Sequence, residues 1–342
     1  MIKSKLISLP TFLGLLILAA LIGCGGGGSD SAATPATPAT PVNPVNPVNP
    51  GDPALNVKIS QIEACPRANA TVYVSVTDQD GYAVTTLTKD DFEVIEQSLS
   101  LGTPTNDAPF VENNASLSVA LVMDYSNSIR SVPANVAAME AAATSFIGQL
   151  GINDEAEIIK YGSTVQVAQA FTDDQIALEA AITTSLNVGD ATALYDAVVL
   201  AVDHTAVRLK DRRAVIVITD GKDSDGTNTG TPGSLNSLVD LIDDANDRGV
   251  PVFTVGLGTA IDIGVLEQMA DDTGGTFSNT ATSGNLLTIY NQLADLLFTN
   301  QYILTYNSGV DEGQAATLNV VATDPADPTL SGDDIKAIPA CP

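Results

Sequence analysis

The chain has no tryptophan, a single histidine and only three cysteines in 342 residues. Catalytic triads and zinc hydrolases rely on histidine and cysteine side chains as bases, nucleophiles and ligands. Because His204 is the sole histidine and no G-x-S-x-G motif occurs, these mechanisms are largely excluded. His204 shares an apolar helical stripe with Leu194, Ala197 and Ala201, which favours a place at the core boundary over a catalytic role.

Basic residues are also scarce, with 14 Lys+Arg against 41 Asp+Glu and a formal net charge of −27. A polyanion of this kind is a poor ligand for nucleic acid, because binding there is dominated by contacts to phosphate. We interpret the charge as a solvated surface that resists aggregation.

The long apolar run that the chain does contain lies at its start, over residues 13–22, behind two lysines. It is too short for an ordinary spanning helix. It leads into Leu21-Ile22-Gly23-Cys24, which resembles a bacterial lipobox. The resemblance implies that residues 1–23 are a signal peptide, that Cys24 becomes a lipidated N-terminus, and that Gly25 directs the protein to the outer membrane. A secretory signal with a chance cysteine is the alternative.

Residues 24–53 contain a glycine run and Thr-Pro-Ala and Val-Asn-Pro repeats. Such segments are extended and build no core. We expect a low-complexity tether with no binding role of its own, which lifts the folded part off the membrane. The folded part would then lie in the periplasm or on the cell surface.

Residues 113–300 alternate strand and helix patterns, which predicts a doubly wound, Rossmann-like α/β fold. The expected strands are residues 117–123, 155–161, 165–171, 214–219, 250–257 and 275–278. The expected helices are residues 133–150, 174–184, 194–209, 235–248, 263–273 and 286–297. In such sheets, ligands bind beyond the carboxyl ends of the strands at the topological switch point.

Oxygen-bearing side chains stand at that end of the expected sheet. Asp124, Ser126 and Ser128 follow the first strand, Thr192 precedes a helix, and Asp220 follows the buried strand before it. Residues i, i+2 and i+4 of an extended segment point the same way, so the first three can aim at one point. Mg²⁺ prefers hard oxygen ligands. Taken alone, D-x-S-x-S would also fit an Asx turn.

The ordered set resembles the metal-ion-dependent adhesion site of von Willebrand factor type A (vWA) domains. The resemblance implies Mg²⁺ (or Mn²⁺) as cofactor, with an open position for a carboxylate from a protein partner. It also implies direct coordination by Asp124, Ser126 and Ser128, by Thr192 in a ligand-bound form, and by Asp220 directly or through water. Tyr125, Asn127 and residues 222–233 would then rim the site.

Asp190 departs from the family pattern, in which glycines often precede the threonine. It could join the metal or cap the following helix, and we expect the cap. Asp223 and Asp225 could form a weak surface cation site. An EF-hand is excluded, because its register would put Gly221 first and Pro232 twelfth.

The flanking segments, residues 54–112 and 301–342, are rich in strand patterns. We expect them to be two halves of one small β-sandwich into which the vWA domain is inserted. If Cys24 carries lipid, Cys65 and Cys341 remain as an even pair in an oxidising compartment. They could bridge the two halves, or stay unpaired or bond between molecules.

The sequence thus predicts a lipid-anchored envelope protein that binds another protein through a divalent metal, and not an enzyme. One alternative is a structural envelope protein that the metal only stiffens. The other is a metal-dependent phosphoester hydrolase.

Overall fold

The computed structural model describes residues 54–97, 99–103, 115–220, 222–227 and 230–341. The expected signal peptide, the lipidation site at Cys24 and the linker to residue 53 lie outside the described residues. Within the part that is described, no helix is long and apolar enough to cross a membrane.

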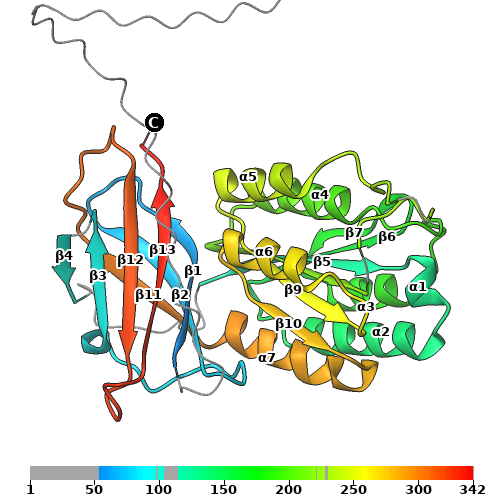
Figure 1. Ribbon diagram of the computed structural model, residues 1–342, viewed down its shortest axis with the longest axis horizontal. Coiled ribbons are helices and arrows are strands. Elements are labelled where there is room, and N and C mark those ends of the chain that lie inside the picture. The colour runs from blue at the N-terminus through cyan, green and yellow to red at the C-terminus, as the bar shows by residue number, and fades with distance from the viewer. Residues whose placement is uncertain (1–53, 98, 104–114, 221, 228–229, 342) are drawn as a thin grey trace, which may run out of the picture. The chain divides into compact units, whose positions relative to one another are not determined.

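A six-stranded sheet forms the middle of the α/β module, in the order β10-β9-β8-β5-β6-β7 (Figure 1). All pairings are parallel except that of β7 with β6. The strands are β5 (Leu117–Asp124), β6 (Glu155–Tyr161), β7 (Val165–Thr172), β8 (Arg212–Thr219), β9 (Val252–Leu257) and β10 (Phe277–Thr280). The predicted doubly wound α/β fold is confirmed.

Helices cover both faces of this sheet (Figure 1). One core cluster joins one sheet face to α2 (Pro133–Ile147), α3 (Gln175–Thr183) and α7 (Leu286–Phe298). The other joins the opposite face to α4 (Leu194–Ala206), α5 (Leu238–Arg248) and α6 (Ile263–Thr273). A short helix, α1 (Asn127–Arg130), follows β5 directly. Two buried layers explain why the inner strands are apolar along their whole length.

Helix boundaries follow local capping more closely than apolar periodicity. The helix expected from residue 235 begins at Leu238, because Ser237 and Asp240 form a capping box. It ends at Arg248, and the next residue, Gly249, closes it in the left-handed conformation. The helix expected to reach residue 150 ends at Ile147.

The two central strands, β5 and β8, mark the topological switch point. The chain leaves β5 towards β6 on one side, whereas it leaves β8 towards β9 on the other. Their connections therefore diverge and leave a crevice beyond the carboxyl ends of both strands. Asp124 ends β5 and Asp220 follows β8, so both carboxylates lie at this crevice.

The flanking segments form two sheets around a separate apolar core. One sheet has the order β1-β2-β11 and the other β13-β12-β3-β4, so each combines strands from both ends of the described chain. The strands are β1 (Asn56–Glu63), β2 (Ala70–Thr77), β3 (Phe92–Glu96), β4 (Leu99–Gly102), β11 (Gln301–Tyr306), β12 (Ala316–Thr323) and β13 (Ser331–Ile338). Strand patterns in the sequence lie at residues 71–76, 87–96, 301–306 and 316–321, whereas β1, β4 and β13 were not expected. The last is rich in aspartate, which local propensity disfavours in strands.

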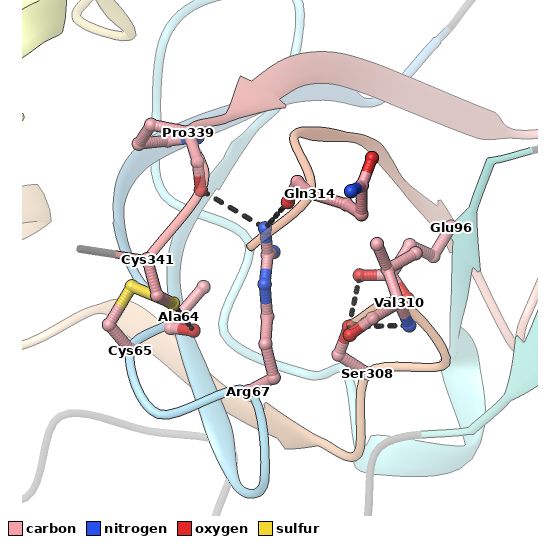
Figure 2. The surroundings of a disulfide bond; sticks show 9 residues. All are labelled: Ala64, Cys65, Arg67, Glu96, Ser308, Val310, Gln314, Pro339 and Cys341. Atoms are coloured by element: carbon pink, nitrogen blue, oxygen red, sulfur yellow. Dashed lines mark hydrogen bonds between the residues drawn. A yellow bond between two sulfur atoms is a disulfide. The ribbon is translucent and has the colours of Figure 1, made fainter. Parts of the chain in front are cut away.

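A disulfide joins Cys65 and Cys341, whose Cα atoms lie 5.6 Å apart (Figure 2). The buried guanidinium of Arg67 reinforces this contact, because its Nη2 donates to the carbonyl oxygens of Gln314 and, at 3.0 Å, Pro339. The segment after β1 is thereby held to the segment after β13.

Candidate metal centre

Asp124 is fully buried at the end of β5 and its carboxylate is held from two sides. Oδ1 accepts a hydrogen bond from the backbone N–H of Ser126 at 2.7 Å. Oδ2 accepts one from Thr219 Oγ1, at the end of β8, also at 2.7 Å. These donors fix the orientation of the carboxylate at the crevice.

Ser126, Ser128 and Asp220 continue from this carboxylate as a chain of oxygens. Ser126 Oγ lies 3.0 Å from Ser128 Oγ, and Ser128 Oγ donates to Asp220 Oδ1 at 2.8 Å. Ser126 is the N-terminal cap residue of α1, with extended backbone angles, and Ser128 lies inside that helix. The structure thus brings together four of the five side chains that the sequence analysis selected.

Thr192, the fifth residue, lies on a loop fastened to the one that follows β8. It forms an antiparallel bridge with Ser224, with N···O distances of 2.8 and 3.0 Å. The neighbouring Asp190 carbonyl accepts from Asn127 N–H at 3.0 Å, which sets this loop against α1. Among the described residues, the Thr192 hydroxyl has no hydrogen bond to the other four side chains.

The cap predicted for Asp190 is wrong. Its carboxylate forms an ion pair with Arg130 and is mostly exposed. The N-cap residue of α4 is Ala193, whose side chain makes no capping hydrogen bond. Because Arg130 already neutralises Asp190, a role as an extra metal ligand is also disfavoured.

Asp223 supplies that cap from a distant part of the chain. Its carboxylate accepts from the N–H groups of Leu194 (2.8 Å) and Tyr195 (3.4 Å) at the start of α4. It also accepts from the N–H groups of Gly233 (2.8 Å) and Ser234 (3.0 Å) and from the Ser234 hydroxyl. A carboxylate offers about four lone-pair sites, so Asp223 has none left for a cation. No local signal marks this cap, because its partners are about thirty residues away.

Tyr125 does not rim the site, contrary to our expectation. Its ring is buried and its hydroxyl donates to Glu140 Oε1 at 2.8 Å, beneath the site. The ammonium of Lys160 lies 4.5 Å from the centre of the ring. Asn127, by contrast, is exposed beside the serines.

The electrostatics of the two carboxylates suit a cation. Burial raises the pKa of Asp124 to about 6, against the opposing effect of the Ser126 hydrogen bonds. Burial likewise raises the pKa of Asp220, although Ser128 donates to it. A divalent ion would offset the cost of the buried charge of Asp124 and of the partly buried charge of Asp220. The described residues contain no cluster of three or more His, Cys, Asp or Glu suited to a metal, so hydroxyl oxygens must complete the set.

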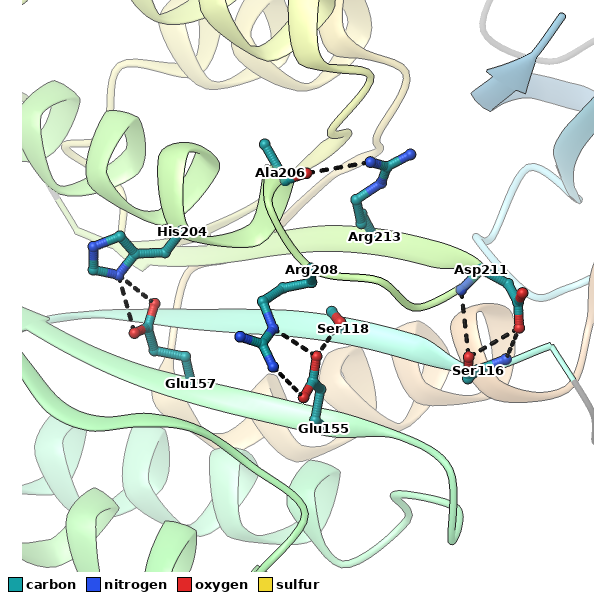
Figure 3. A network of polar contacts seen from close by, with 9 residues as sticks. All are labelled: Ser116, Ser118, Glu155, Glu157, His204, Ala206, Arg208, Asp211 and Arg213. Carbon is teal, nitrogen blue, oxygen red and sulfur yellow. Dashed lines mark hydrogen bonds and ion pairs between the residues drawn. The ribbon is translucent and has the colours of Figure 1, made fainter. Parts of the chain in front are cut away.

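His204 lies in a polar network at the opposite, amino-terminal end of the strands (Figure 3). Its Nδ1 is 3.1 Å from both carboxylate oxygens of Glu157. Nearby, Arg208 makes a two-pronged ion pair with Glu155, and both distances are 2.8 Å. The half-buried His204 is a boundary residue, as expected, and it is remote from the candidate metal centre.

Curated relatives match more than half of this chain. A UPF0353 protein of Mycobacterium leprae is 27% identical over an alignment of 221 residues, and the match covers 57% of this chain and 64% of the relative. A UPF0353 protein of Mycobacterium tuberculosis is 25% identical over the same coverage. The chain therefore spans less than two thirds of the length of these relatives.

Solved structures are similar to this chain at low sequence identity. A von Willebrand factor type A protein from Catenulispora acidiphila is 12% identical with a TM-score of 0.46, covering 84% of this chain and 73% of that one. Proximal thread matrix protein 1 from the mussel byssus, with zinc in its MIDAS motif, is 19% identical with a TM-score of 0.48, covering 58% and 50%. The family model of the von Willebrand factor type A domain matches residues 118–292, more than half of the chain, and the chain therefore belongs to the von Willebrand factor type A domain family.

Proposed function

We propose that this protein binds another protein through a divalent cation, Mg²⁺ or Mn²⁺, held at the crevice beyond β5 and β8. The observation that carries the proposal is the run of oxygens from Asp124 through Ser126 and Ser128 to Asp220, closed by hydrogen bonds of 3.0 and 2.8 Å. Hydroxyl and carboxylate oxygens are the ligands that Mg²⁺ takes. Thr192 would join when a partner is bound.

The ligand set favours a cation that keeps an unfilled position. The set supplies only two carboxylates, and its other ligands are neutral hydroxyls. The cation therefore keeps Lewis acidity and an open position, which a carboxylate from the partner can fill. The chain itself carries a formal charge of −27, which repels acidic groups. A partner's carboxylate would therefore bind here only when the cation is present.

The loop after β8 offers the partner an exposed apolar side chain near the Thr192 loop. Leu235 is 97% exposed, yet its backbone N–H donates to Asp196 Oδ2 at 2.9 Å. Two residues earlier, a Cβ on Gly233 would stand only 2.3 Å from the Thr192 carbonyl oxygen, so the turn is pressed against the Thr192 loop. An exposed leucine on a backbone that is held in place can serve as an anchor in a protein interface.

The cellular setting belongs to the same proposal. Lipidation at Cys24 would place the protein in the cell envelope, on a tether formed by residues 25–53. Cys24→Ala should release it from the membrane fraction, with the loss of the lipid mass checked on the N-terminal peptide. A variant that stays in that fraction would contradict the anchor.

A capture experiment tests the binding function. The purified chain, Asp220→Asn and Asp225→Asn are each offered envelope extract with Mg²⁺ or with EDTA, and retained proteins are quantified by mass spectrometry. Asp225 is a matched control, since it lies on the same loop and its carboxylate accepts from the N–H and hydroxyl of Thr227. We expect a partner whose capture requires Mg²⁺ and Asp220 but tolerates Asp225→Asn.

Two other outcomes would overturn the proposal. One is that the partner is captured equally well with Mg²⁺ and with EDTA, and that Asp220→Asn lowers only the melting temperature. This would indicate a structural metal. Metal-dependent turnover of a phosphoester that Asp220→Asn abolishes would indicate a hydrolase.

A further inference from the structure

Three fully buried polar side chains stand side by side across the carboxyl ends of the central strands. Tyr161 ends β6 directly opposite Asp124 on β5, and the pairing of Met123 with Ile218 sets Thr219 of β8 on the other side of Asp124. Alternation along the strands puts all three on the face that packs against α4, where Tyr161 shares a core cluster with Val122 and Leu194.

The hydroxyls on the two sides of Asp124 are used differently. Thr219 Oγ1 donates to Asp124 Oδ2 at 2.7 Å. The Tyr161 hydroxyl is buried and makes no hydrogen bond of regular geometry among the described residues, although the side chains of Asp124 and Thr219 lie close enough to affect its pKa. The negative charge of Asp124 nonetheless acts on this hydroxyl. The pKa of Tyr161 is raised well above its usual value, mainly by burial and secondly by the charge of Asp124.

We propose that Tyr161 is a positioning residue for the metal, whose hydroxyl donates a hydrogen bond to the Asp124 carboxylate in the cation-bound protein. A carboxylate has about four lone-pair sites. Ser126 N–H and Thr219 take two, and the cation takes a third, which leaves one for Tyr161. Donors behind a ligating carboxylate fix its orientation and commonly change metal affinity tenfold or more. This inference rests on the proposed metal site.

The competing explanation is that Tyr161 only fills the core. A phenylalanine at position 161 would fill the core equally well. It would also avoid the cost of burying an unpaired hydroxyl. This fold does contain another such group: Tyr290 on α7 is fully buried, its hydroxyl also has no partner among the described residues, and it packs on the opposite face of the sheet. Tyr290 therefore provides a matched control.

The test compares Tyr161→Phe and Tyr290→Phe in the purified full-length chain, with Mn²⁺ alone as the probe. Mn²⁺ affinity is measured by titration calorimetry, and thermal unfolding is measured in EDTA. For Tyr161→Phe we expect about tenfold weaker Mn²⁺ binding and a melting temperature in EDTA that is unchanged or higher. Tyr290→Phe should leave the Mn²⁺ affinity unchanged, with a melting temperature in EDTA that is unchanged or higher.

Each other outcome decides against the inference. Equal Mn²⁺ affinities for the wild type and Tyr161→Phe would show that the hydroxyl does not serve the metal. A melting temperature in EDTA that falls for Tyr161→Phe would show a structural role. Failure of the proposed function is distinguishable, because the wild type itself would then bind no Mn²⁺ and Asp220→Asn would behave like it.

Discussion

At the residue scale, the composition of the oxygen set determines how strongly the site should hold a metal. Two carboxylates and three neutral hydroxyls form a weakly charged site, and tight sites generally have more carboxylates. Asp190 and Asp223, which might have added charge, are occupied by Arg130 and by the turn at Gly233.

We therefore predict modest Mg²⁺ or Mn²⁺ affinity without a partner, in the micromolar-to-millimolar range. Titration calorimetry of the purified chain measures it, with Asp220→Asn as the control that should bind far more weakly. Nanomolar Ca²⁺ binding in preference to Mg²⁺ would mean that the ligand set is different from the one described.

Metal binding should also depend on pH near the pKa of Asp124. Burial raises that pKa to about 6, above its ordinary value, so a proton competes with the cation for the carboxylate as the pH falls below 6. We expect nearly constant affinity from pH 7 to 8 and a loss that approaches tenfold per unit below about 6. Mn²⁺ titrations between pH 5 and 8 check this; a flat profile would contradict it.

The raised pKa of Asp124 also affects the stability of the metal-free protein. Stability falls as the pH rises, whereas metal affinity increases. Because the folded-state pKa exceeds the unfolded-state value, Asp124 contributes stability at low pH that is lost as the pH rises through about 6.

At the scale of elements, the site depends on loops that long-range hydrogen bonds hold in place. The loop after β8 pairs with Thr192 through a β-bridge and caps α4 through Asp223. It also donates a backbone hydrogen bond to Asp196, in the first turn of that helix. The helix start, the Thr192 loop and the turn before α5 therefore form one connected unit.

Removing the Asp223 carboxylate should loosen that unit. Asp223→Ala leaves two N–H groups of α4 and two of the Gly233–Ser234 turn without their acceptor, at an expected cost of about 2 kcal/mol in the free energy of unfolding. Denaturant unfolding measures it. Asp225→Ala, on the same loop but exposed, should change stability by no more than about 0.5 kcal/mol; equal effects would refute the cap.

At the scale of the whole molecule, one covalent bond ties together segments from both ends of the described chain. Cys65 follows β1, Cys341 follows β13, and the bond spans a sequence separation of 276 residues. The chain-entropy model puts its effect at about 5 kcal/mol, an upper bound because the folded α/β module shortens the effective loop.

We predict that Cys65→Ser with Cys341→Ser lowers the free energy of unfolding by about 2–5 kcal/mol. Denaturant unfolding with and without reductant measures it, and reductant should not affect the double variant. Free thiols at both positions in non-reducing peptide mapping would remove the basis for this expectation.

Much of this protein was readable from local sequence patterns. Residues 117–123 and 214–219 are apolar runs long enough to be buried strands, and their polar ends mark the crevice, because side-chain type and backbone direction are local properties. The D-x-S-x-S spacing likewise specifies which oxygens can converge.

Tertiary structure decided what depends on partners far along the chain. Asp190 was expected to cap α4 because it lies just before that helix in the sequence. In the folded chain, Asp190 pairs with Arg130 instead, and Asp223 caps the helix. Strand β13 is aspartate-rich, and only pairing with β12 makes it a strand. Tyr161 reads as an ordinary strand residue, and only the register of β5 with β6 sets it beside Asp124.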